Sequence, residues 1–541
     1  MDKTGLKCCA ISWMLLALLL GVSSSARAQF TTLYSFTGGT DGAYPYDALL
    51  YNSGTLYGTT FTASDGGGTV FKITTAGALK TLYTFGTNPN DGANPWDGVV
   101  RDSAGNLYGT TQEGGTDIVG TIFQVTKTGK ESVLYDFMWQ GGLTGYYPTA
   151  GLVLDASGNL YGVTSGGNNS GGGVVFQLTP TDALNVLYSF TDGGDGGGPG
   201  AALILDASGN LYGTTGNGGA SGSGTVFELS PEPTSGCAAG SNTGNGWCET
   251  VLYSFTGGAD GGYPQGNLIF DTSGNLYGTT EFGGNASCTN PLGTTGCGTV
   301  FELSPEPGSG CPAGSNLGIG WCETPIYAFA GTPDAVSPSV GLVMNSTNSL
   351  FGTSEFGGTN GVGTVFELSP VAETAPGCPG ANSGNGWCEI VLHSFTGAAY
   401  PGDGGYPMGG IALDKSGNLY GTTSAGGYDG ICSTCGYGTV FMVSAPAAAA
   451  VIMGSSQNPA TVGETVTFTA TITSKFPIPD GEVVRFTAGA NQSGTGYTTN
   501  GVATWTTSFS KAKTYTVKGS YPGDVFHKPA HGTVKEIVNA E

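Results

Sequence analysis

One short word, Asp-Gly-x-x-Pro, places a carboxylate at intervals along this sequence. Five copies are complete and a sixth has Ala for Gly, with the carboxylates at Asp41, Asp91, Asp195, Asp260, Asp403 and, in the variant, Asp334. A seventh copy keeps Pro148 but has Thr144 where Asp is expected. Six carboxylates on equivalent loops would suit a cation or the hydroxyl groups of a glycan. The same word also forms turns, because Asp accepts backbone N–H bonds and Gly tolerates positive φ, and this interpretation is favoured.

Three tryptophans stand in a second repeated word, Gly-x-Gly-Trp-Cys-Glu. They are Trp247, Trp321 and Trp387, each directly before a cysteine. The face of an indole ring stacks on sugar C–H groups, so these residues are candidates for glycan binding. A small disulfide-closed hairpin also needs one large side chain to cover its bridge, and this structural role is favoured.

Catalytic chemistry has few candidate residues in this chain. Of the three histidines, His393 stands where other repeats have Tyr, and His527 and His531 belong to the C-terminal segment. No Ser-His-Asp set or His-rich metal site can be assembled from them. A carboxylate pair for glycoside hydrolysis stays open, although no Asp or Glu pair departs from the repeated pattern. We therefore expect a non-enzymatic protein without a cofactor. The Asp-Gly loops would nevertheless suit a bound cation.

Ten of the twelve cysteines fall into close pairs. The pairs are Cys237/Cys248, Cys288/Cys297, Cys311/Cys322, Cys378/Cys388 and Cys432/Cys435. An even number of cysteines in an exported chain predicts disulfides, here five local ones. Cys432-Ser-Thr-Cys435 also has the spacing of two zinc ligands, but no second such pair and no nearby His completes a four-ligand set.

The frame that must position these residues is a repeat. The word Leu-Tyr-Gly-Thr-Thr, with small variations, begins seven times, at Leu56, Leu107, Leu160, Leu211, Leu276, Leu350 and Leu419. In the fourth copy, apolar runs at 203–206, 210–215, 224–229 and 251–255 are bounded by Gly, Ser, Asn or Pro. Such β-branched and aromatic runs are typical of short antiparallel strands. Each repeat therefore predicts four strands and no helix.

Seven four-stranded repeats predict a seven-bladed β-propeller. The last repeat ends at its third strand near Phe441, while a lone fourth-strand word, Leu33-Tyr34-Ser35-Phe36, opens the array. We therefore expect the N-terminal strand to complete the seventh blade and close the ring, which removes two exposed strand edges. A β-solenoid has much shorter repeats, and a row of separate sandwiches would need linkers that the sequence lacks.

The sequence changes character after the array. Residues 444–450, with Pro446 and four alanines, form a predicted linker, and residues 451–541 alternate in longer strands that suit an Ig-like β-sandwich. This segment resembles bacterial Ig-like repeat domains in the words Asn458-Pro459, Gly463-Glu464-Thr465-Val466-Thr467-Phe468-Thr469-Ala470 and Tyr521-Pro522-Gly523-Asp524. Typical members read Pro-Thr-Gly where this chain has Pro479-Asp480-Gly481.

The array itself resembles the GloVer tandem-repeat family of exported bacterial proteins. The words that carry the resemblance are Gly-Asn-Leu-Tyr-Gly-Thr-Thr and Gly-Thr-Val-Phe-Glu-Leu, over residues 31–443. The resemblance implies export and, in many members, a variable C-terminal surface anchor, but no established reaction. Residues 537–541 have no apolar tail or sorting signal, which departs from that pattern.

The N-terminal segment and the net charge limit the partners that this protein can have. Residues 1–28 combine Lys3 and Lys7, an apolar run and the cleavage-site word Ala26-Arg27-Ala28, which predicts a signal peptide and no membrane span. Without this segment, which holds three basic and one acidic residue, the net charge changes from −23 to −25. Phosphate backbones need clustered Lys and Arg, so nucleic acid is excluded as a partner.

We therefore expect a secreted, periplasmic or cell-surface monomer with a signal peptide (1–28), a propeller (29–443), a linker (444–450) and an Ig-like sandwich (451–541). Its predicted role is to bind glycans or surface proteins through the face that carries the Asp-Gly loops. The alternatives are a carbohydrate-active propeller enzyme, either hydrolase or lyase, and a purely structural envelope module.

Overall fold

The computed structural model describes residues 30–540 except positions 65, 89, 140–143, 168–170, 239–240, 308–309, 312–315, 319, 371–381, 385, 398–401, 428–435, 446, 475–477, 479, 491 and 524–526. Within these residues every regular element is a β-strand, which confirms the predicted all-β class, and none is a helix long and apolar enough to cross a membrane. The chain divides into two compact units, one of residues 28–446 and one that contains residues 447–541. The predicted signal segment lies outside the described residues.

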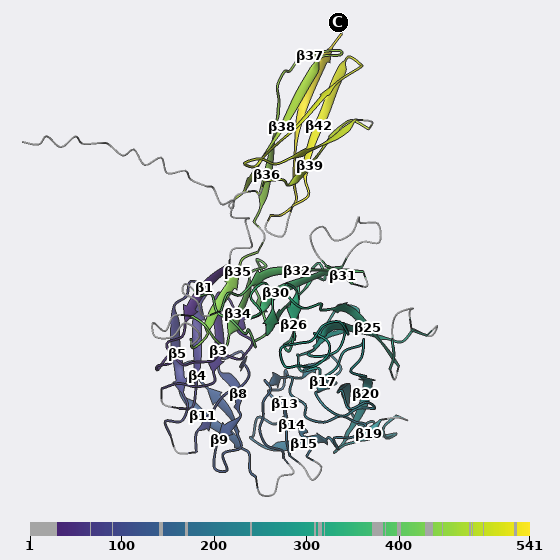
Figure 1. Cartoon of the computed structure of the whole chain (residues 1–541). Helices are drawn as coiled ribbons and strands as arrows, with labels where there is room; N and C mark the ends of the chain where they lie inside the picture. The colour runs from purple at the N-terminus through teal and green to yellow at the C-terminus, as the bar shows by residue number, and fades with distance from the viewer. Residues whose placement is uncertain are drawn as a thin grey trace, which may run out of the picture. The chain divides into compact units, whose positions relative to one another are not determined.

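Seven antiparallel sheets of four or five strands, with two two-stranded ladders in their loops, make up the described part of the first unit (Figure 1). We number them sheet 1 to sheet 7 in chain order. Their strands are β2 (Leu50–Asn52), β3 (Thr55–Thr60), β4 (Thr69–Thr74) and β5 (Leu79–Thr84) in sheet 1; β7 (Val100–Arg101), β8 (Leu107–Thr111), β10 (Thr121–Val125) and β11 (Glu131–Asp136) in sheet 2; β12 (Val153–Leu154), β13 (Leu160–Thr164), β14 (Val174–Leu178) and β15 (Leu184–Ser189) in sheet 3; β16 (Ile204–Leu205), β17 (Leu211–Thr215), β18 (Thr225–Pro231), β20 (Trp247–Ser254) and β19 (Asn242–Thr243) in sheet 4.

The remaining sheets follow the same order. Their strands are β21 (Ile269–Phe270), β22 (Leu276–Thr280), β23 (Thr299–Pro305), β25 (Trp321–Ala328) and β24 (Asn316–Leu317) in sheet 5; β27 (Val343–Met344), β28 (Leu350–Ser354), β30 (Thr364–Pro370), β32 (Trp387–Ser394) and β31 (Asn382–Gly384) in sheet 6; β33 (Ala412–Leu413), β34 (Leu419–Thr423), β35 (Thr439–Val443) and β1 (Phe30–Ser35) in sheet 7. The N-terminal strand β1, in purple in Figure 1, thus pairs with β35 of the last repeat. This pairing is predicted from the lone fourth-strand word at the N-terminus and the incomplete last repeat.

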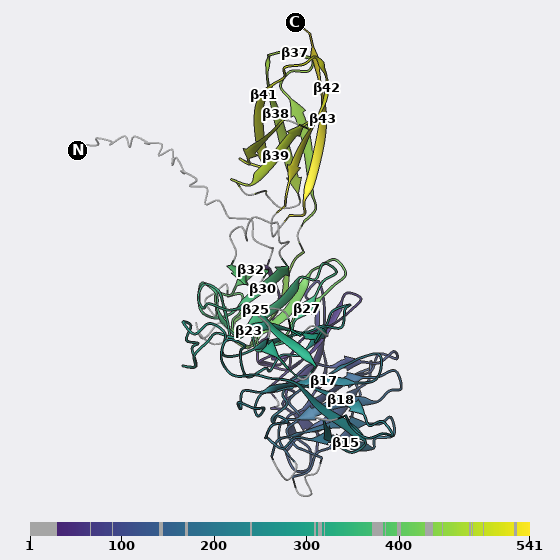
Figure 2. The same ribbon diagram turned by 90° about the vertical axis from the view of Figure 1, so that its right-hand side faces the viewer.

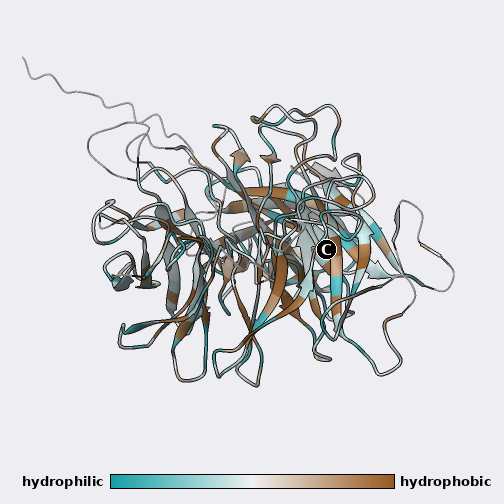
Figure 3. Cartoon of the chain, turned by 90° about the horizontal axis from the view of Figure 1, so that it is seen from below, coloured by the Kyte–Doolittle hydropathy of each residue, from teal (hydrophilic) through white to brown (hydrophobic). Residues whose placement is uncertain are grey.

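The apolar cores lie between neighbouring sheets. One cluster joins Val70 and Phe85 of the first repeat to Leu107 and Phe123 of the second. Another joins Phe36, Leu56 and Phe71 to Tyr420 and Val440, and therefore lies between sheet 1 and sheet 7. Hydrophobic residues, in brown in Figure 3, concentrate along the strands. Because each sheet has two covered faces, no repeat could bury its apolar residues alone.

The loops that carry the Asp-Gly-x-x-Pro word pair with the loops between the second and third strands of the same sheet. Two of these contacts are short ladders, β6 (Gly92–Ala93) with β9 (Glu113–Gly114) and β26 (Ala335–Val336) with β29 (Phe356–Gly357). The other five are single bridges, Ala43 with Thr62, Tyr146 with Gly166, Gly197 with Asn217, Gly262 with Phe282 and Gly405 with Ala425. Within each sheet, the two loops therefore lie at the same end.

The second unit is a two-sheet sandwich (Figure 2). One sheet contains β36 (Ala449–Ser455), β38 (Thr465–Ser474) and β41 (Val502–Ser508); the other contains β37 (Ala460–Thr461), β43 (Ala530–Asn539), β42 (Lys513–Tyr521), β39 (Val483–Ala488) and β40 (Ser493–Tyr497). Val466, Phe468, Val484 and Phe486 alternate inward and are fully buried. The predicted Ig-like sandwich is confirmed, and β36 begins inside the segment predicted as a linker.

Candidate functional site

All six predicted aspartates form a hydrogen bond with a Tyr or His side chain of the strand directly before their loop. This strand is the fourth of each repeat, and we call it the outer strand. The distances to the Tyr hydroxyl are 3.0 Å for Asp41 with Tyr34, 2.8 Å for Asp91 with Tyr83, 3.0 Å for Asp195 with Tyr188, 2.9 Å for Asp260 with Tyr253 and 3.0 Å for Asp334 with Tyr327. In the last repeat, His393 replaces the Tyr and lies 2.6 Å from Asp403. The motif thus joins an outer strand to the following loop in each of these repeats.

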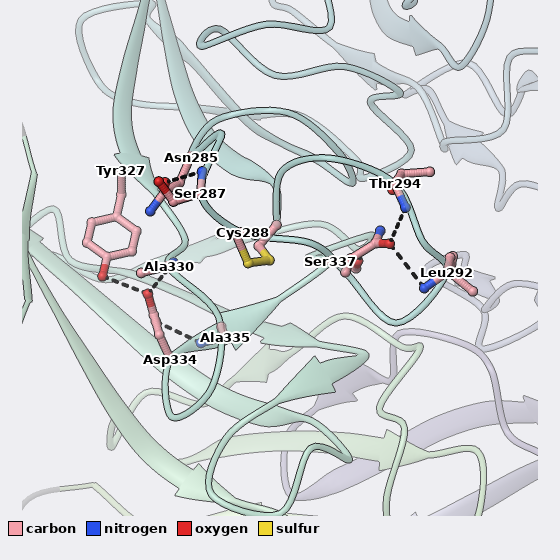
Figure 4. The surroundings of a disulfide bond; sticks show 12 residues. Asn285, Ser287, Cys288, Leu292, Thr294, Tyr327, Ala330, Asp334, Ala335 and Ser337 are labelled. Carbon is pink, nitrogen blue, oxygen red and sulfur yellow. Dashed lines mark hydrogen bonds between the residues drawn. A yellow bond between two sulfur atoms is a disulfide. The ribbon is translucent and has the colours of Figure 1, made fainter.

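Asp334 illustrates how fully these carboxylates are used within the fold (Figure 4). One oxygen accepts bonds from the Tyr327 hydroxyl and from the Ala330 N–H at 2.8 Å, and the other accepts from the Ala335 N–H at 2.7 Å. Burial raises the pKa of Asp334 and of Asp91 above the usual range. Burial also opposes ionisation of Asp403, but hydrogen bonds from His393 and Thr396 outweigh it and lower its pKa. Binding of a ligand by these carboxylates stays a prediction.

The loop before sheet 3 lacks the repeated carboxylate, because Thr144 stands in place of the Asp. Asp136, at the end of the outer strand, accepts bonds from the Thr116 N–H at 3.1 Å and from the Thr116 hydroxyl at 2.5 Å. Asp136 thus joins β11 to the loop between β9 and β10 of its own sheet, a different contact from that of the loop aspartates.

The aspartates at the Ser-Gly-Asn hairpins form turns, as predicted. Asp155 accepts bonds from the N–H groups of Ser157 and Asn159 at 2.8 Å, and from the Asn159 side chain at 2.7 Å. Burial acts against its ionisation, but these hydrogen bonds prevail and lower its pKa. Asp102 and Asp414 make equivalent bonds to their hairpin residues.

The three predicted tryptophans begin the outer strands β20, β25 and β32. Each is half-buried and packs on the core between its own sheet and the preceding one, Trp247 between sheets 3 and 4, Trp321 between sheets 4 and 5, and Trp387 between sheets 5 and 6. This packing agrees with the structural interpretation. A role in sugar binding stays a prediction for these residues.

Three of the five predicted disulfides are present. They join Cys237 to Cys248, Cys288 to Cys297 and Cys311 to Cys322. Cys388 is also disulfide-bonded, while Cys378, Cys432 and Cys435 lie outside the described residues. The spacing of the pairs suggests cysteines in loops between strands, but Cys248, Cys322 and Cys388 lie inside β20, β25 and β32, where the inserts add β19, β24 and β31 as fifth strands beside them.

A cavity of about 530 Å³ opens among the loops of all seven repeats. From each repeat it receives the residue directly after the proline of the Asp-Gly-x-x-Pro word, namely Tyr46, Trp96, Thr149, Gly200, Gln265, Ser339 and Met408. Two further lining residues, Glu281 and Glu355, directly follow the Leu-Tyr-Gly-Thr-Thr word. The cavity lining thus includes positions that vary while their neighbours repeat, beside repeated apolar positions such as Leu268, Leu342 and Ile411.

One part of the cavity is aromatic. The Tyr46 ring lies 5.1 Å from the Trp96 ring and 5.3 Å from the Phe61 ring, and Phe61 meets Trp96 edge-on at 5.4 Å. These three residues come from the first two repeats. Their rings support one another, which gives a rigid apolar surface at low cost in side-chain entropy.

Another part of the cavity is acidic and comes from the fifth and sixth repeats. Burial, and next the charge of Glu355, raise the pKa of Glu281 to about 7. Burial also raises the pKa of Glu355. The pKa of Tyr263 is raised by burial and then by the charge of Glu281, so these groups lie close together. The amide of Gln265 lies on the same part of the lining.

Two further carboxylates stand near the aromatic residues. Asp97 lines the cavity and accepts bonds from the N–H groups of Gly98 and Gly151 at 2.6 and 2.7 Å. Asp47 is fully buried and accepts from the Thr59 N–H at 2.8 Å. Burial raises both pKa values, and Asp97 adds to the rise at Asp47. Among the described residues, no group of three or more His, Cys, Asp or Glu side chains is placed to hold a metal ion.

The same backbone conformation recurs two residues before each of the cavity residues that follow the prolines. The residue before the proline has positive φ in all seven repeats, including Tyr44 (55°), Tyr147 (54°), Tyr263 (59°) and Tyr406 (53°). Such a backbone is rare for bulky residues and is found where the surroundings enforce it, often at functional sites. At Tyr263, the N–H donates to Ser223 of sheet 4 at 2.8 Å, and the carbonyl accepts from the Glu281 N–H at 3.2 Å.

No repeated word in the sequence pointed to Tyr46, Trp96, Glu281 or Glu355 as site residues. The position after Leu-Tyr-Gly-Thr-Thr is filled by Phe61, Gln112, Ser165, Gly216, Glu281, Glu355 and Ser424. A variable position beside an otherwise repeated word was the available signal. It marks residues that the repeat itself does not require.

Comparison with known families and structures completes the description. The profile described as "Gloeobacter/Verrucomicrobia repeat" matches residues 23–227 and 140–310, and that described as "Bacterial Ig-like domain (group 3)" matches residues 453–539. Among curated proteins, none matches the chain significantly.

Similar solved structures are distant. They include the extracellular domain of the one component system BT4673 from B. thetaiotaomicron, at 9% identity over 91% of this chain and 86% of that chain, with a TM-score of 0.26. A polysaccharide lyase, PL25 ulvan lyase, is 11% identical over 67% of this chain and 96% of that one, with a TM-score of 0.28. At these scores neither structure carries a functional argument.

Proposed function

The chain belongs to the Gloeobacter/Verrucomicrobia repeat family and carries a bacterial Ig-like domain. From this premise we propose that its seven sheets form a closed β-propeller whose central cavity binds a neutral glycan outside the cytoplasm. The observation that carries the proposal is the cavity itself, in which an aromatic cluster and paired glutamates are brought together from distant repeats.

The bonds between neighbouring sheets support the closed ring. In every repeat the N–H of the residue before the proline donates to a loop of the preceding sheet, as Asn94 does to Gly67 and Tyr406 to Val362. The same bond runs from Tyr44 of the first repeat to Tyr437 of the last. The hydroxyl of Thr422 in sheet 7 also donates to the Asp47 carbonyl of the first repeat at 3.0 Å. Together with the β1–β35 pairing, these contacts join both ends of the array.

The chemistry of the cavity supports a sugar ligand. The apolar face of a pyranose ring fits against Tyr46 and Trp96, and its hydroxyls fit carboxyl and amide groups such as those of Glu281, Glu355 and Gln265. The cavity volume lies within the range of small-ligand sites. This assignment moves the predicted ligand contacts from the six loop aspartates to the residues that follow the loop prolines.

The charge supports a neutral rather than an anionic sugar. The chain carries a net charge of −23, and Asp97, Glu281 and Glu355 all line the cavity. Uronates and sulfated sugars would meet like charge there, which disfavours their binding.

The proposed location is the periplasm, the cell surface or the medium. The disulfides and the Ig-like domain are typical of proteins outside the cytoplasm. The predicted signal segment, residues 1–28, and the division into an array, a short linker and a sandwich complete this proposal.

One observation favours a second function, hydrolysis of the bound glycan. A carboxyl group with a pKa of about 7, such as that of Glu281, is partly protonated at neutral pH and suits a general acid. Glu355 would then act as the base or nucleophile. Release of reducing ends by the wild type, and its loss in both Glu281→Gln and Glu355→Gln, would support this function over binding alone.

The proposal is tested by binding of the full chain to immobilised neutral polysaccharides (xylan, mannan and β-glucan) and to anionic alginate and pectin. We expect binding to at least one neutral polymer, weakened about tenfold or more in Trp96→Ala because a packed aromatic anchor is lost. The matched control is Tyr497→Ala, an aromatic that is 65% exposed in the Ig-like unit. Binding to none of these polymers, or unchanged binding by Trp96→Ala, would reject the glycan site and favour a structural module.

A further inference from the structure

Large apolar side chains gather on the exposed surface beside the second and third repeats. Ile118 is 65% exposed, Met138 48% and Trp139 56%. The Trp139 ring lies 4.8 Å from the half-buried Tyr146 ring and 6.4 Å from that of Tyr147. We call Trp139, Tyr146 and Tyr147 the outer aromatic patch. Exposed apolar groups clustered in this way mark surfaces that bind something.

The patch coincides with the repeat that departs from the common pattern. Elsewhere a Thr such as Thr37, Thr191 or Thr256 donates its hydroxyl to the loop aspartate. Here Met138 stands at the position of that Thr, and Thr144 at the position of the Asp. Both partners of the structural bond are therefore replaced, and the following residue is an exposed Trp where the first and fifth repeats have Gly38 and Gly257.

The exposed tryptophan is nevertheless held by specific bonds. Its backbone N–H donates to the Asp117 carboxylate at 2.8 Å. The loop that contains Asp117 is in turn tied to the outer strand by the bonds from Thr116 to Asp136. The backbone bond fixes the chain at Trp139, and the Tyr146 ring packs beside the exposed indole at 4.8 Å, which limits the entropy that the ring would lose on binding.

The patch lies close to the cavity along the chain. Thr149, which lines the cavity, follows Tyr146 by three residues, so the two are at most about 11 Å apart along the chain. The Tyr147 N–H also bonds to the Val119 carbonyl at 2.9 Å, which fixes this segment to the neighbouring loop. A ligand that fills the cavity and extends past Thr149 would reach the outer aromatic patch.

We propose that the outer aromatic patch is a second contact for the glycan in the cavity, so that the ligand is a polymer rather than a short sugar. This inference rests on the proposed glycan site. Stacking of one sugar ring on Trp139, beyond those in the cavity, gives the affinity a dependence on chain length. A protein partner is the alternative occupant, and the short chain distance between Tyr146 of the patch and Thr149 of the cavity favours the polymer.

The test compares a neutral polysaccharide bound by the wild type with its own trisaccharide, using the full chain and titration calorimetry. We expect Trp139→Ala to weaken polymer binding about threefold to tenfold, the range of one aromatic contact, and to leave trisaccharide binding unchanged. Trp139→Phe should restore most of the polymer affinity. Trp96→Ala should weaken both ligands, and Tyr497→Ala neither.

The outcomes separate the two proposals. If Trp96→Ala weakens both ligands and Trp139→Ala weakens neither, the inference is overturned while the glycan site stands, and a protein partner becomes the occupant to seek. If Trp139→Ala weakens the trisaccharide as strongly as the polymer, the patch belongs to the cavity and is no separate contact. If the wild type binds neither ligand, the proposed function fails and the inference fails with it.

Discussion

At the scale of single residues, the last three positions of Leu-Tyr-Gly-Thr-Thr have separate structural roles. Gly58 has no side chain because the buried Phe71 ring occupies that space, and an added Cβ would lie 2.8 Å from it. Thr59 donates to the Asp97 carbonyl of the next repeat at 3.2 Å. Thr60 bonds to Thr69 within its own sheet at 2.9 Å. The word is repeated because each position joins a different pair of elements.

The hydrogen bond of the Thr422 hydroxyl tests how much the contact between the last and first repeats contributes to stability. We expect Thr422→Val to lower the free energy of unfolding by about 1 kcal/mol, because the buried Asp47 carbonyl loses its donor. Val fits sterically, since Val163 occupies the equivalent position in the third repeat. Urea denaturation measures the change. Thr471→Val, on a solvent-accessible position of the Ig-like sandwich, is the control, and an equal effect there would show that the joint contributes nothing specific.

The pKa of Glu281 makes the stability of the repeat unit depend on pH. Its folded value of about 7 lies above its ordinary value of 4.5, so the folded state holds the proton more tightly. The free energy of unfolding should therefore fall as pH rises from about 4.5 to about 7, by roughly 2–3 kcal/mol, since each pKa unit corresponds to about 1.4 kcal/mol.

Glu281→Gln should remove this dependence, with a higher Tm than the wild type at pH 8 and a similar Tm at pH 4.5. Calorimetry at several pH values measures both. Glu113→Gln, at an exposed position, serves as the control. A wild-type Tm for the repeat unit that does not fall between pH 4.5 and pH 7 would contradict the buried, paired environment assigned to Glu281.

At the scale of elements, the disulfide inserts bind to their neighbours as well as closing hairpins. In the insert of sheet 4, the Asn245 N–H donates to the Leu187 carbonyl and its side chain to the Val186 carbonyl, both at 3.0 Å. Both acceptors belong to β15 of sheet 3. In the insert of sheet 5, Gly318 lies too close to the Leu252 carbonyl of sheet 4 to carry a side chain. The inserts therefore cover the outer edges of preceding sheets.

Removal of the Cys237–Cys248 bridge tests this role. In Cys237→Ser/Cys248→Ser we expect a loss of about 2–3 kcal/mol, as the entropy of a short loop predicts, while the sheets stay folded. Hydrogen exchange should increase at Asn245 and along β15. Exchange confined to the insert would show that it does not stabilise sheet 3.

Mass mapping of a non-reduced digest tests the two predicted pairs, Cys378/Cys388 and Cys432/Cys435.

At the scale of the whole molecule, strand β1 decides whether the array is closed. Deletion of residues 30–35 would expose the edge of β35 and open the core between sheets 7 and 1. In a closed ring this should lower the Tm of the entire repeat unit by about 10 °C or more in a single transition. In an open array only the last repeat would fray. Calorimetry distinguishes the two, with Thr32→Ala, which keeps the backbone pairing, as the control.

The sequence alone determined the local architecture. Runs of β-branched and aromatic residues between Gly, Ser and Asn predict the strands, and the repeated word predicts how many sheets they form. The N-terminal strand word predicts the partner of β35, because an incomplete last repeat needs a fourth strand. The C-terminal sandwich and the pairs Cys237/Cys248, Cys288/Cys297 and Cys311/Cys322 follow from equally local signals. Each of these features depends on residues close together in the chain or on a regular spacing.

The tertiary structure alone decided which residues form the candidate site. Phe61 and Glu281 are 220 positions apart in the sequence, and no spacing rule relates them. They line or adjoin one cavity because equivalent loops of all the sheets converge on it. The repeated aspartates, which were the evident candidates, are occupied by hydrogen bonds of the fold. The proposed ligand contacts are instead the variable positions beside them, because a repeat can change only those residues that its own hydrogen bonds and packing do not use.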